Sequence, residues 1–259
     1  MQKIKHIVSI DESLCKLCGK CREDCPDGAL IKKDNVIKHT GRFCVKCGHC
    51  VAICPEKAVS ISGYEDPPEE IDPDSSVDPD ALLAQIKARR STRQFLNKHV
   101  SPEDIAKIIE AGRYTPTGGN KQGVSYVVIR ETLAACEKVA ISRLRLLKPL
   151  LSLFRPYLRR IKIDDRFLFK GAPVVIVIVS ENKLDGALAA STMELMARSL
   201  GLGALYSGFF TSALQKSKKL KRMLSIAPWE RVVATLVIGH PDVQYHRTAQ
   251  RERAFVIYK

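Results

Sequence analysis

The stretch CKLCGKCREDCP at residues 15–26 decides the organisation of the chain, because it recurs 29 residues later as CVKCGHCVAICP at residues 44–55. Each copy contains four cysteines at the same spacing and ends in Cys-Pro. A short β-prone run follows each copy, at residues 29–31 and 58–61. The repeat predicts two half-domains related by a pseudo-twofold axis within residues 1–64.

The spacing Cys-x-x-Cys-x-x-Cys-x-x-x-Cys-Pro is the ligand run of bacterial two-cluster ferredoxins, in which the fourth cysteine ligates the other cluster. We therefore predict two 4Fe-4S clusters with crossed ligation. The first would be held by Cys15, Cys18, Cys21 and Cys54, and the second by Cys44, Cys47, Cys50 and Cys25. Gly19 and Gly48 would let the backbone approach the sulfides. A zinc ribbon is the alternative, but it needs only two cysteine pairs, whereas each run here supplies four cysteines.

The rest of the composition is that of a packed globular protein in a reducing compartment. Hydrophobic residues make up 45% of the 259 residues, and no window of 18 residues is continuously apolar. The polar start at residues 1–10 lacks a signal-peptide core. The ninth cysteine, Cys136, stands apart and is predicted to be a buried helical residue. We expect a cytoplasmic protein, of a kind suited to an anaerobe.

Charge is distributed unevenly along the chain. Residues 65–80 contain eight acidic and no basic side chains, and their prolines predict a solvated linker. Residues 81–259 contain 31 basic and 13 acidic side chains, an excess of +18. Such a field favours an acidic partner. No nucleic-acid-binding motif accompanies it, so we do not expect nucleic acid as the ligand.

Residues 81–259 mix predicted helices and strands. Asp78-Pro79 and Ser101-Pro102 each indicate a helix start, because an N-cap residue precedes proline at the first helical position. Strands are predicted at 124–129, 173–179, 230–238 and 254–258, and further helices at 185–200 and 211–224. The stretch 173–179 is apolar on both faces and is therefore predicted to be central. The fold class is α+β.

Two further segments have the composition of an anion and ring-binding site. RRSTRQF at residues 89–95 places three arginines and a hydroxyl at a helix end, which suits a phosphate. TPTGGNKQ at residues 115–122 is a glycine-rich loop whose carboxamides could hydrogen-bond a heteroaromatic ring. Taken singly, a solvated basic helix end and a simple turn would explain these segments equally well.

Together these segments resemble the nitroreductase family of FMN-dependent oxidoreductases. The resemblance continues through residues 173–178, 186–190, 201–208 and 237–241, so that it covers 81–259. With the cysteine-rich segment in front, the chain is similar to the ferredoxin-fused nitroreductases of anaerobic microbes. The resemblance implies an α+β sandwich that forms an intertwined homodimer, with one FMN at each end of the interface.

The resemblance also implies the residues that contact FMN. The ribityl phosphate and the pyrimidine side of the ring would be contacted by Arg89, Arg90, Ser91 and Arg93. The partner subunit would supply Pro116, Thr117, Gly118 and Asn120. Ser207 and Gly208 would face the ring through their backbone, and Arg251, with Arg247 in reserve, would bind the phosphate. Gly118 and Gly119 stand where many members have serines.

Residues 141–163 match nothing in the family. They contain seven basic and no acidic side chains, with apolar residues near helical spacing. Pro149 and Pro156 are predicted to kink or divide the helix. This segment could form a lid over the flavin, or a surface helix packing its leucines on the domain. Contact with an acidic protein or, less favoured, with a membrane surface is the remaining interpretation.

These expectations combine into one function. Single electrons from an acidic donor such as a ferredoxin or flavodoxin would pass through the clusters to FMN, which would reduce a small electrophile. A nitroaromatic, a quinone or an activated alkene fits that description. No side chain is predicted to act as an acid or base. Two alternatives remain: a relay to another protein, and a flavin-modifying protein without an external substrate.

Overall fold

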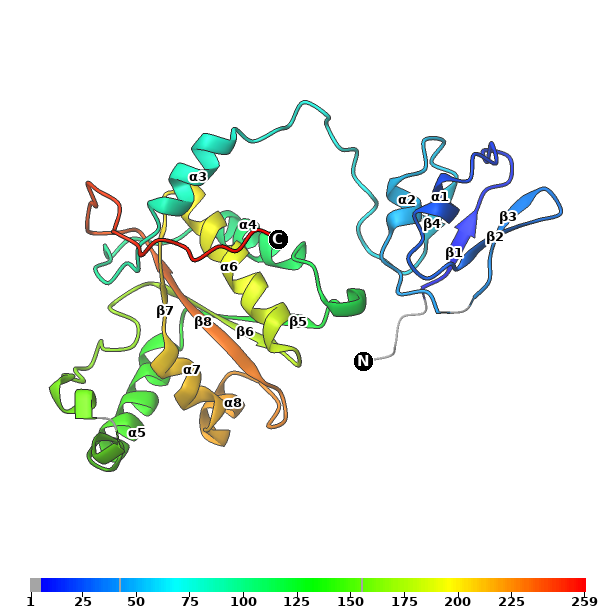
Figure 1. Ribbon diagram of the computed structural model, residues 1–259. Helices are drawn as coiled ribbons and strands as arrows, with labels where there is room; N and C mark the ends of the chain where they lie inside the picture. The colour runs from blue at the N-terminus through cyan, green and yellow to red at the C-terminus, as the bar shows by residue number, and fades with distance from the viewer. Residues whose placement is uncertain (1–5, 42, 155) are drawn as a thin grey trace. The chain divides into compact units, whose positions relative to one another are not determined.

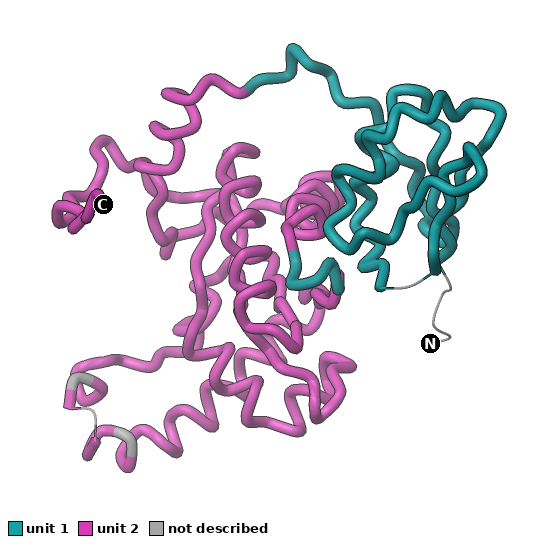
Figure 2. The backbone as a smooth tube through the Cα atoms, turned by 45° about the vertical axis from the view of Figure 1, so that its right-hand side comes forward, with its two compact units in different colours: residues 1–76, 117–121 teal, residues 77–116, 122–259 magenta. Residues whose placement is uncertain are grey.

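The computed structural model describes residues 6–41, 43–154 and 156–259 (Figure 1). The chain forms two compact units, residues 1–76 with 117–121, and residues 77–116 with 122–259 (Figure 2). The first boundary falls within the predicted linker, whereas residues 117–121 group with unit 1 although we expected them in the second domain. Predictions that concern residues 1–5 and Arg155 lie outside the described residues.

Unit 1 consists of two halves built in the same way. Strand β1 (Val8–Ile10) pairs antiparallel with β4 (Val59–Ile61), and β2 (Leu30–Lys33) pairs antiparallel with β3 (Val36–His39). Short helices α1 (Lys20–Glu23) and α2 (His49–Ala52) carry the third cysteine of each run. Matching hydrogen bonds of 2.8 Å, from Asp11 N to Ala58 O and from Thr40 N to Ala29 O, extend the two strand pairs by one residue each. The sequence repeat is therefore a structural repeat.

Backbone conformation follows the same repeat. Leu17 and Lys46 both have a φ of 57°, and Gly19 and Gly48 have φ of 80° and 79°. Left-handed backbone at these positions turns the chain between successive cysteines, and glycine adopts it without steric cost. The small core beneath these turns consists of Val8, Cys21, Leu30, Ile37 and Val59.

Unit 2 is organised around one four-stranded antiparallel sheet. Its strands are β5 (Val124–Ile129), β6 (Val174–Ser180), β8 (Val232–Gly239) and β7 (Gly203–Tyr206), in that order across the sheet. Every residue of β6 is buried. Val175, Val177 and Val179 pack into one core cluster, whereas Val174, Ile176 and Ile178 pack into another. The predicted central strand is thus buried on both faces.

Helices cover both faces of this sheet (Figure 1). Helices α4 (Pro102–Arg113) and α6 (Lys183–Ser199) pack on the Ile176 face, and α3 (Pro79–Lys87) contacts α6. Helices α5 (Leu133–Phe154), α7 (Gly208–Gln215) and α8 (Lys218–Met223) lie on the Val177 face. Short 3-10 helices span Gly118–Asn120 (η1) and Pro156–Arg160 (η2). The α+β sandwich is confirmed.

Helix starts were predicted correctly where a cap residue precedes proline. The Asp78 carboxylate accepts from Asp80 N and Ala81 N, and the Ser101 hydroxyl accepts from Asp104 N. Cys136 is fully buried in α5, as predicted. No helix in the described part of the chain is long and apolar enough to cross a membrane.

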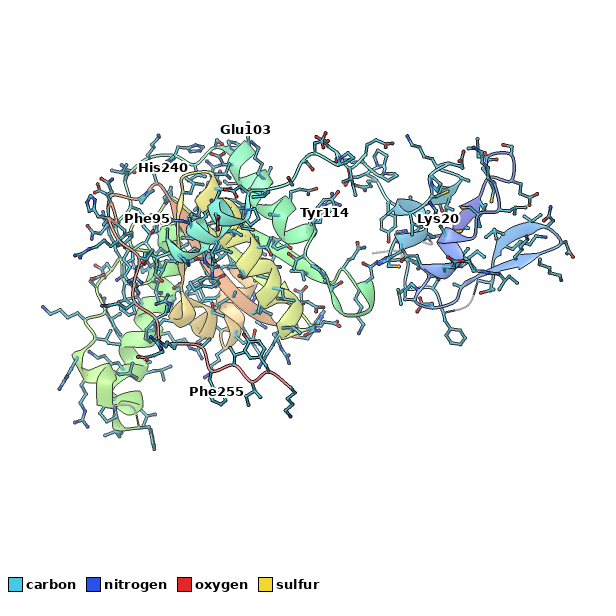
Figure 3. All side chains as sticks on the ribbon, turned by 45° about the horizontal axis from the view of Figure 1, so that its top comes forward. Lys20, Phe95, Glu103, Tyr114, His240 and Phe255 are labelled. Carbon is cyan, nitrogen blue, oxygen red and sulfur yellow. The ribbon has the colours of Figure 1, made fainter. Side chains whose placement is uncertain are left out.

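Three predictions need correction, and one strand was not predicted. Residues 254–258 form no strand, and Phe255 is 91% exposed (Figure 3). The predicted helix 211–224 is two helices, because the Ser217 hydroxyl caps a new one by accepting from Leu220 N. Strand β7 was missed. Helix α5 begins at Leu133, before the basic segment 141–163. Pro149 lies inside this helix and does not divide it, whereas Pro156 begins the separate helix η2.

Candidate functional site

The eight cysteines of unit 1 gather into two groups of four. Ile10, Ile37 and Val59 help to line one pocket. Its sulfur-bearing residues are Cys15, Cys18, Cys21 and Cys54. A second pocket is lined by Cys25, Cys44, Cys47 and Cys50. These are the groups that crossed ligation requires, because the fourth cysteine of each run lies with the first three of the other.

The electrostatics of these groups disfavour free thiolates. The pKa of Cys50 is raised to about 11, mainly by burial and to a smaller extent by the neighbouring Cys47, Cys44 and Cys25. Burial also raises the pKa of Cys21, and Cys54 is the next largest cause. Because four anionic sulfurs repel one another in a partly buried site, they need a cation between them. No group of three His, Cys, Asp or Glu side chains among the described residues converges on a single metal ion.

Backbone N–H groups point at the fourth cysteine of each run. Ala29 N donates to Cys25 Sγ at 3.3 Å, and Ala58 N donates to Cys54 Sγ at the same distance. These bonds repeat with the 29-residue period of the sequence. Hydrogen bonds to cluster sulfurs are one of the means by which proteins set reduction potential. The donor set therefore fits two four-iron clusters.

In unit 2, the segment that contains Ser91 lies beside strand β7. Ser91 forms a parallel bridge with Ala204, and Thr92 N donates to Ala204 O at 2.9 Å. A Cβ atom on Gly203 would lie 2.5 Å from Thr92 Oγ1, so only glycine permits this approach. The three arginines of the motif are thereby held along one edge of the sheet.

The surroundings of these arginines differ. Arg89 Nη1 lies 3.4 Å from Glu194 Oε2 on α6. Arg90 lies over the ring of Tyr245, with its Cζ 6.0 Å from the centroid. Arg93 has only a long contact of 3.5 Å to the Ser91 carbonyl. Among the described residues, Arg90 and Arg93 have no carboxylate partner, which leaves their charges available to an anion.

Two residues beside Arg89 were not predicted from the sequence. Partial burial raises the pKa of Tyr206, and the nearby Glu194 carboxylate raises it further. Glu194 thus lies between the Arg89 guanidinium and the Tyr206 phenol. Arg89 and Glu194 are 105 residues apart, and no sequence pattern links them. Tyr245, whose hydroxyl donates to Ser91 O at 3.4 Å, was missed for the same reason.

Ser207 and Gly208 stand where β7 passes into α7. The buried Ser207 hydroxyl donates to Leu168 O at 3.0 Å, so its proton is already used in a hydrogen bond within the protein. Gly208 is exposed, and a Cβ atom built on it would meet nothing within 4 Å. At these two positions, backbone groups are therefore what a ligand could contact.

The other expected flavin contacts are divided between the two units. Pro116 belongs to unit 2, whereas Thr117, Gly118 and Asn120 belong to unit 1. Within unit 1, Asn120 Nδ2 donates to Val45 O at 3.2 Å and to Lys46 O at 2.9 Å. This places Asn120 on the loop between Cys44 and Cys47. Arg247 and Arg251 are exposed in the segment after β8, where Arg251 Nη1 donates to Gln250 O at 3.4 Å.

Comparison with known proteins identifies both parts of the chain. Residues 86–240 match the nitroreductase family, and residues 7–55 match the 4Fe-4S dicluster domain. A relative from Archaeoglobus fulgidus, named as a candidate NADH dehydrogenase/NAD(P)H nitroreductase, is 26% identical over 173 residues. The match covers 61% of this chain and 84% of that protein.

Solved structures agree with the fold. A nitroreductase from Bacteroides fragilis with bound FMN has a TM-score of 0.55 and 20% identity, and the match covers 68% of this chain and 98% of that one. An FMN-dependent nitroreductase from Clostridium difficile also has a TM-score of 0.55 and 20% identity. That match covers 70% of this chain and 100% of the Clostridium protein. Since the family match spans more than half of the sequence, the chain belongs to the nitroreductase family and carries a 4Fe-4S dicluster domain ahead of its nitroreductase domain.

Proposed function

We propose that this protein is an FMN-dependent oxidoreductase that receives single electrons through two 4Fe-4S clusters and reduces a small electrophile such as a nitroaromatic, a quinone or an activated alkene. The observation that carries the proposal is the gathering of eight cysteines into two groups of four in a member of the nitroreductase family. One-electron centres are useful to a flavoenzyme whose donor supplies electrons singly. A hydride donor would not need them.

The proposed flavin site rests on residues along the edge of β7. Arg90 and Arg93 would bind the phosphate, because their charges have no partner among the described residues. Arg89, held by Glu194, and Ser91 would face the pyrimidine side of the ring. Gly208 would present its backbone without a side chain in the way. Bound FMN would supply hydride transfer, while the protein positions the cofactor and excludes water.

We further propose that the working unit is a homodimer in which the second subunit completes each flavin site. Pro116, Thr117, Gly118 and Asn120 would come from the second subunit, and Arg251, with Arg247 in reserve, would close on the phosphate. Asn120 also hydrogen-bonds the loop between Cys44 and Cys47. This contact supports an electron path that leaves the cluster of Cys44, Cys47, Cys50 and Cys25 toward the flavin.

The first experiment is anaerobic purification followed by metal, sulfide and flavin analysis. We expect about eight irons per chain, as two cubes require, and one FMN. Iron near two per chain, or stoichiometric zinc, would contradict the cluster assignment.

The second experiment measures turnover with nitroaromatic, quinone and enoate substrates, supplied with either photoreduced ferredoxin or NADH. Faster turnover with ferredoxin supports the proposal. Turnover with NADH alone would favour hydride donation, which the name of the Archaeoglobus relative would suggest. Full reduction of the flavin without turnover of any substrate would instead favour an electron relay.

A further inference from the structure

Unit 2 contains a cavity that the residues proposed to bind FMN do not line. It has a volume of about 800 Å³ and lies between α5 and residues 165–172, with Phe95 and Asn97 at its edge. Figure 3 labels Phe95, which is bridged to Pro241 after β8. Small-molecule sites usually measure roughly 300–1,000 Å³. None of the expected flavin contacts lines this cavity.

The cavity combines an apolar wall with a basic rim. Phe95, Leu133, Ile141 and Phe169 contribute apolar surface. The rim bears four cationic side chains, Lys138, Arg145, Arg166 and Lys170, against two acidic ones, Glu137 and Asp165. This leaves an excess of two positive charges at the rim.

The acidic groups are already occupied within the protein. Asp165 pairs with Arg145 at 2.8 Å. The buried Glu137 carboxylate accepts from Leu168 N at 2.9 Å and from Phe169 N at 2.8 Å. Both carboxylates therefore already have partners within the protein.

Among the described residues, only Arg145 of the four cations at the rim has a carboxylate partner, and Lys170 Nζ lies 4.8 Å from the centroid of the Phe167 ring. Lys138 and Arg166 have no carboxylate partner among the residues that the structure describes. Arg166 lies over Gly171, whose added Cβ would be 3.7 Å from Arg166 Nη1. Arg166 is exposed, so its N–H donors are accessible at the cavity rim. A guanidinium and an ammonium at one rim suit a carboxylate or a similar anion.

The cavity wall is also fixed rather than loose. Glu137 joins α5 to the backbone of residues 168 and 169, and the Ser207 hydroxyl holds the Leu168 carbonyl at 3.0 Å. A preformed wall lowers the entropic cost of binding. We infer that this cavity binds an organic anion whose apolar body packs on Phe95, Ile141 and Phe169 and whose carboxylate is held by Lys138 and Arg166.

The test is isothermal titration calorimetry of the full-length holoprotein with naphthalene-1-carboxylate as the probe. Naphthalene-1-carboxamide, which has the same shape without the charge, is the matched control ligand. We expect the carboxylate to bind at least about tenfold more tightly, since one charge-assisted hydrogen bond contributes about 1.5–3 kcal/mol and tenfold corresponds to 1.4 kcal/mol. Its affinity should fall as salt rises.

Variants locate the site. The double variant K138Q/R166Q should lose the preference for the carboxylate, whereas K219Q/R222Q, which removes the same two charge types from exposed positions on α8, should keep it. Ala134→Phe should weaken binding of both probes by occupying part of the cavity. Equal affinities for the two probes would overturn the inference. So would a K138Q/R166Q variant that binds like the wild type, or no binding at all.

Discussion

Arg89, Arg90 and Arg93 lie within five residues, but in the part of the chain that the structure describes only Arg89 is paired with a carboxylate. We therefore predict that Arg90→Gln and Arg93→Gln each weaken FMN binding by about tenfold or more, because each removes a charged hydrogen-bond donor from the phosphate. Their affinity for riboflavin, which lacks the phosphate, should stay close to that of the wild type. Fluorescence titration of the apoprotein with both ligands measures the difference.

The control for this prediction is Arg222→Gln, which removes an exposed guanidinium from α8. It should leave both affinities unchanged. Equal losses for FMN and riboflavin in Arg90→Gln would instead mean that this arginine contacts the ring or supports the fold.

The cysteine grouping makes a prediction that separates crossed from uncrossed ligation. Cys25→Ser should lose about half of the iron, since it removes one ligand of one cluster. Adding Cys50→Ser to Cys25→Ser should remove little further iron, because Cys25 and Cys50 lie in the same group. Adding Cys21→Ser should remove the remaining iron, because Cys21 belongs to the other group. Iron and sulfide analysis of the three variants after anaerobic purification gives the answer.

Cys136→Ser is the matched control for these substitutions, because Cys136 lies in α5 and in neither group. It should retain all of the iron. The reverse pattern, in which Cys21→Ser adds nothing to Cys25→Ser, would show that each run serves its own cluster.

At the scale of elements, Glu137 joins helix α5 to residues 168 and 169. Glu137→Ala should lower the free energy of unfolding by about 3 kcal/mol, because two backbone N–H groups lose their acceptor in a buried place. Glu137→Gln keeps an acceptor oxygen and should therefore lower the free energy of unfolding clearly less than Glu137→Ala does. Chemical denaturation of unit 2, followed by tyrosine and tryptophan fluorescence, measures both. Equal losses in the two variants would show that the carboxylate charge, rather than the acceptor, holds this loop.

The same carboxyl predicts a pH dependence. Burial raises the pKa of Glu137 above its ordinary value of 4.5. The folded state therefore binds this proton more tightly than the unfolded state. The associated stability is fully present below the unfolded pKa and is lost as pH rises through the folded pKa. Glu137→Gln should remove this component, so its unfolding free energy should change less with pH above 4.5 than that of the wild type. An unchanged pH profile would contradict this account.

Elements with strong local signals were predictable from the sequence. The strand 124–129, the buried strand β6 and the proline-marked starts of α3 and α4 all follow from local patterns of hydrophobicity and capping. Strand β7 is four residues long and begins with glycine, so its pattern is too short to read. Residues 254–258 have strand-like composition but no partner strand, which shows that local propensity alone does not make a strand.

The features of the candidate sites also fall into those that local sequence predicts and those that it does not. Cysteine grouping could be predicted because a fixed spacing encodes it. The Arg89–Glu194 pair, the Ser207–Leu168 bond and the Asn120–Lys46 bond could not, because each joins residues at least 39 positions apart through the tertiary fold.

For the whole molecule, the basic excess of residues 81–259 suggests that an acidic donor is guided by charge. We predict that reduction by an acidic ferredoxin slows as salt rises, since the electrostatic reach is about 8 Å near physiological ionic strength. Reduction by uncharged or small reductants should depend much less on salt, and that comparison is the control. Stopped-flow rates across a salt series test the point. Rates that are independent of salt would remove electrostatic steering while leaving the cluster assignment intact.

The most direct test of the central claim, that the clusters pass electrons to the flavin, is stopped-flow reduction of the flavin by photoreduced ferredoxin. The comparison is between the wild type, Cys25→Ser/Cys54→Ser and Cys136→Ser, each with its FMN content verified. We predict that the double variant is reduced about 100-fold more slowly or worse, because tethering of the clusters no longer supplies electrons locally. Cys136→Ser should match the wild type. Equal rates in all three proteins would contradict the account, because the donor would then reach the flavin without the clusters.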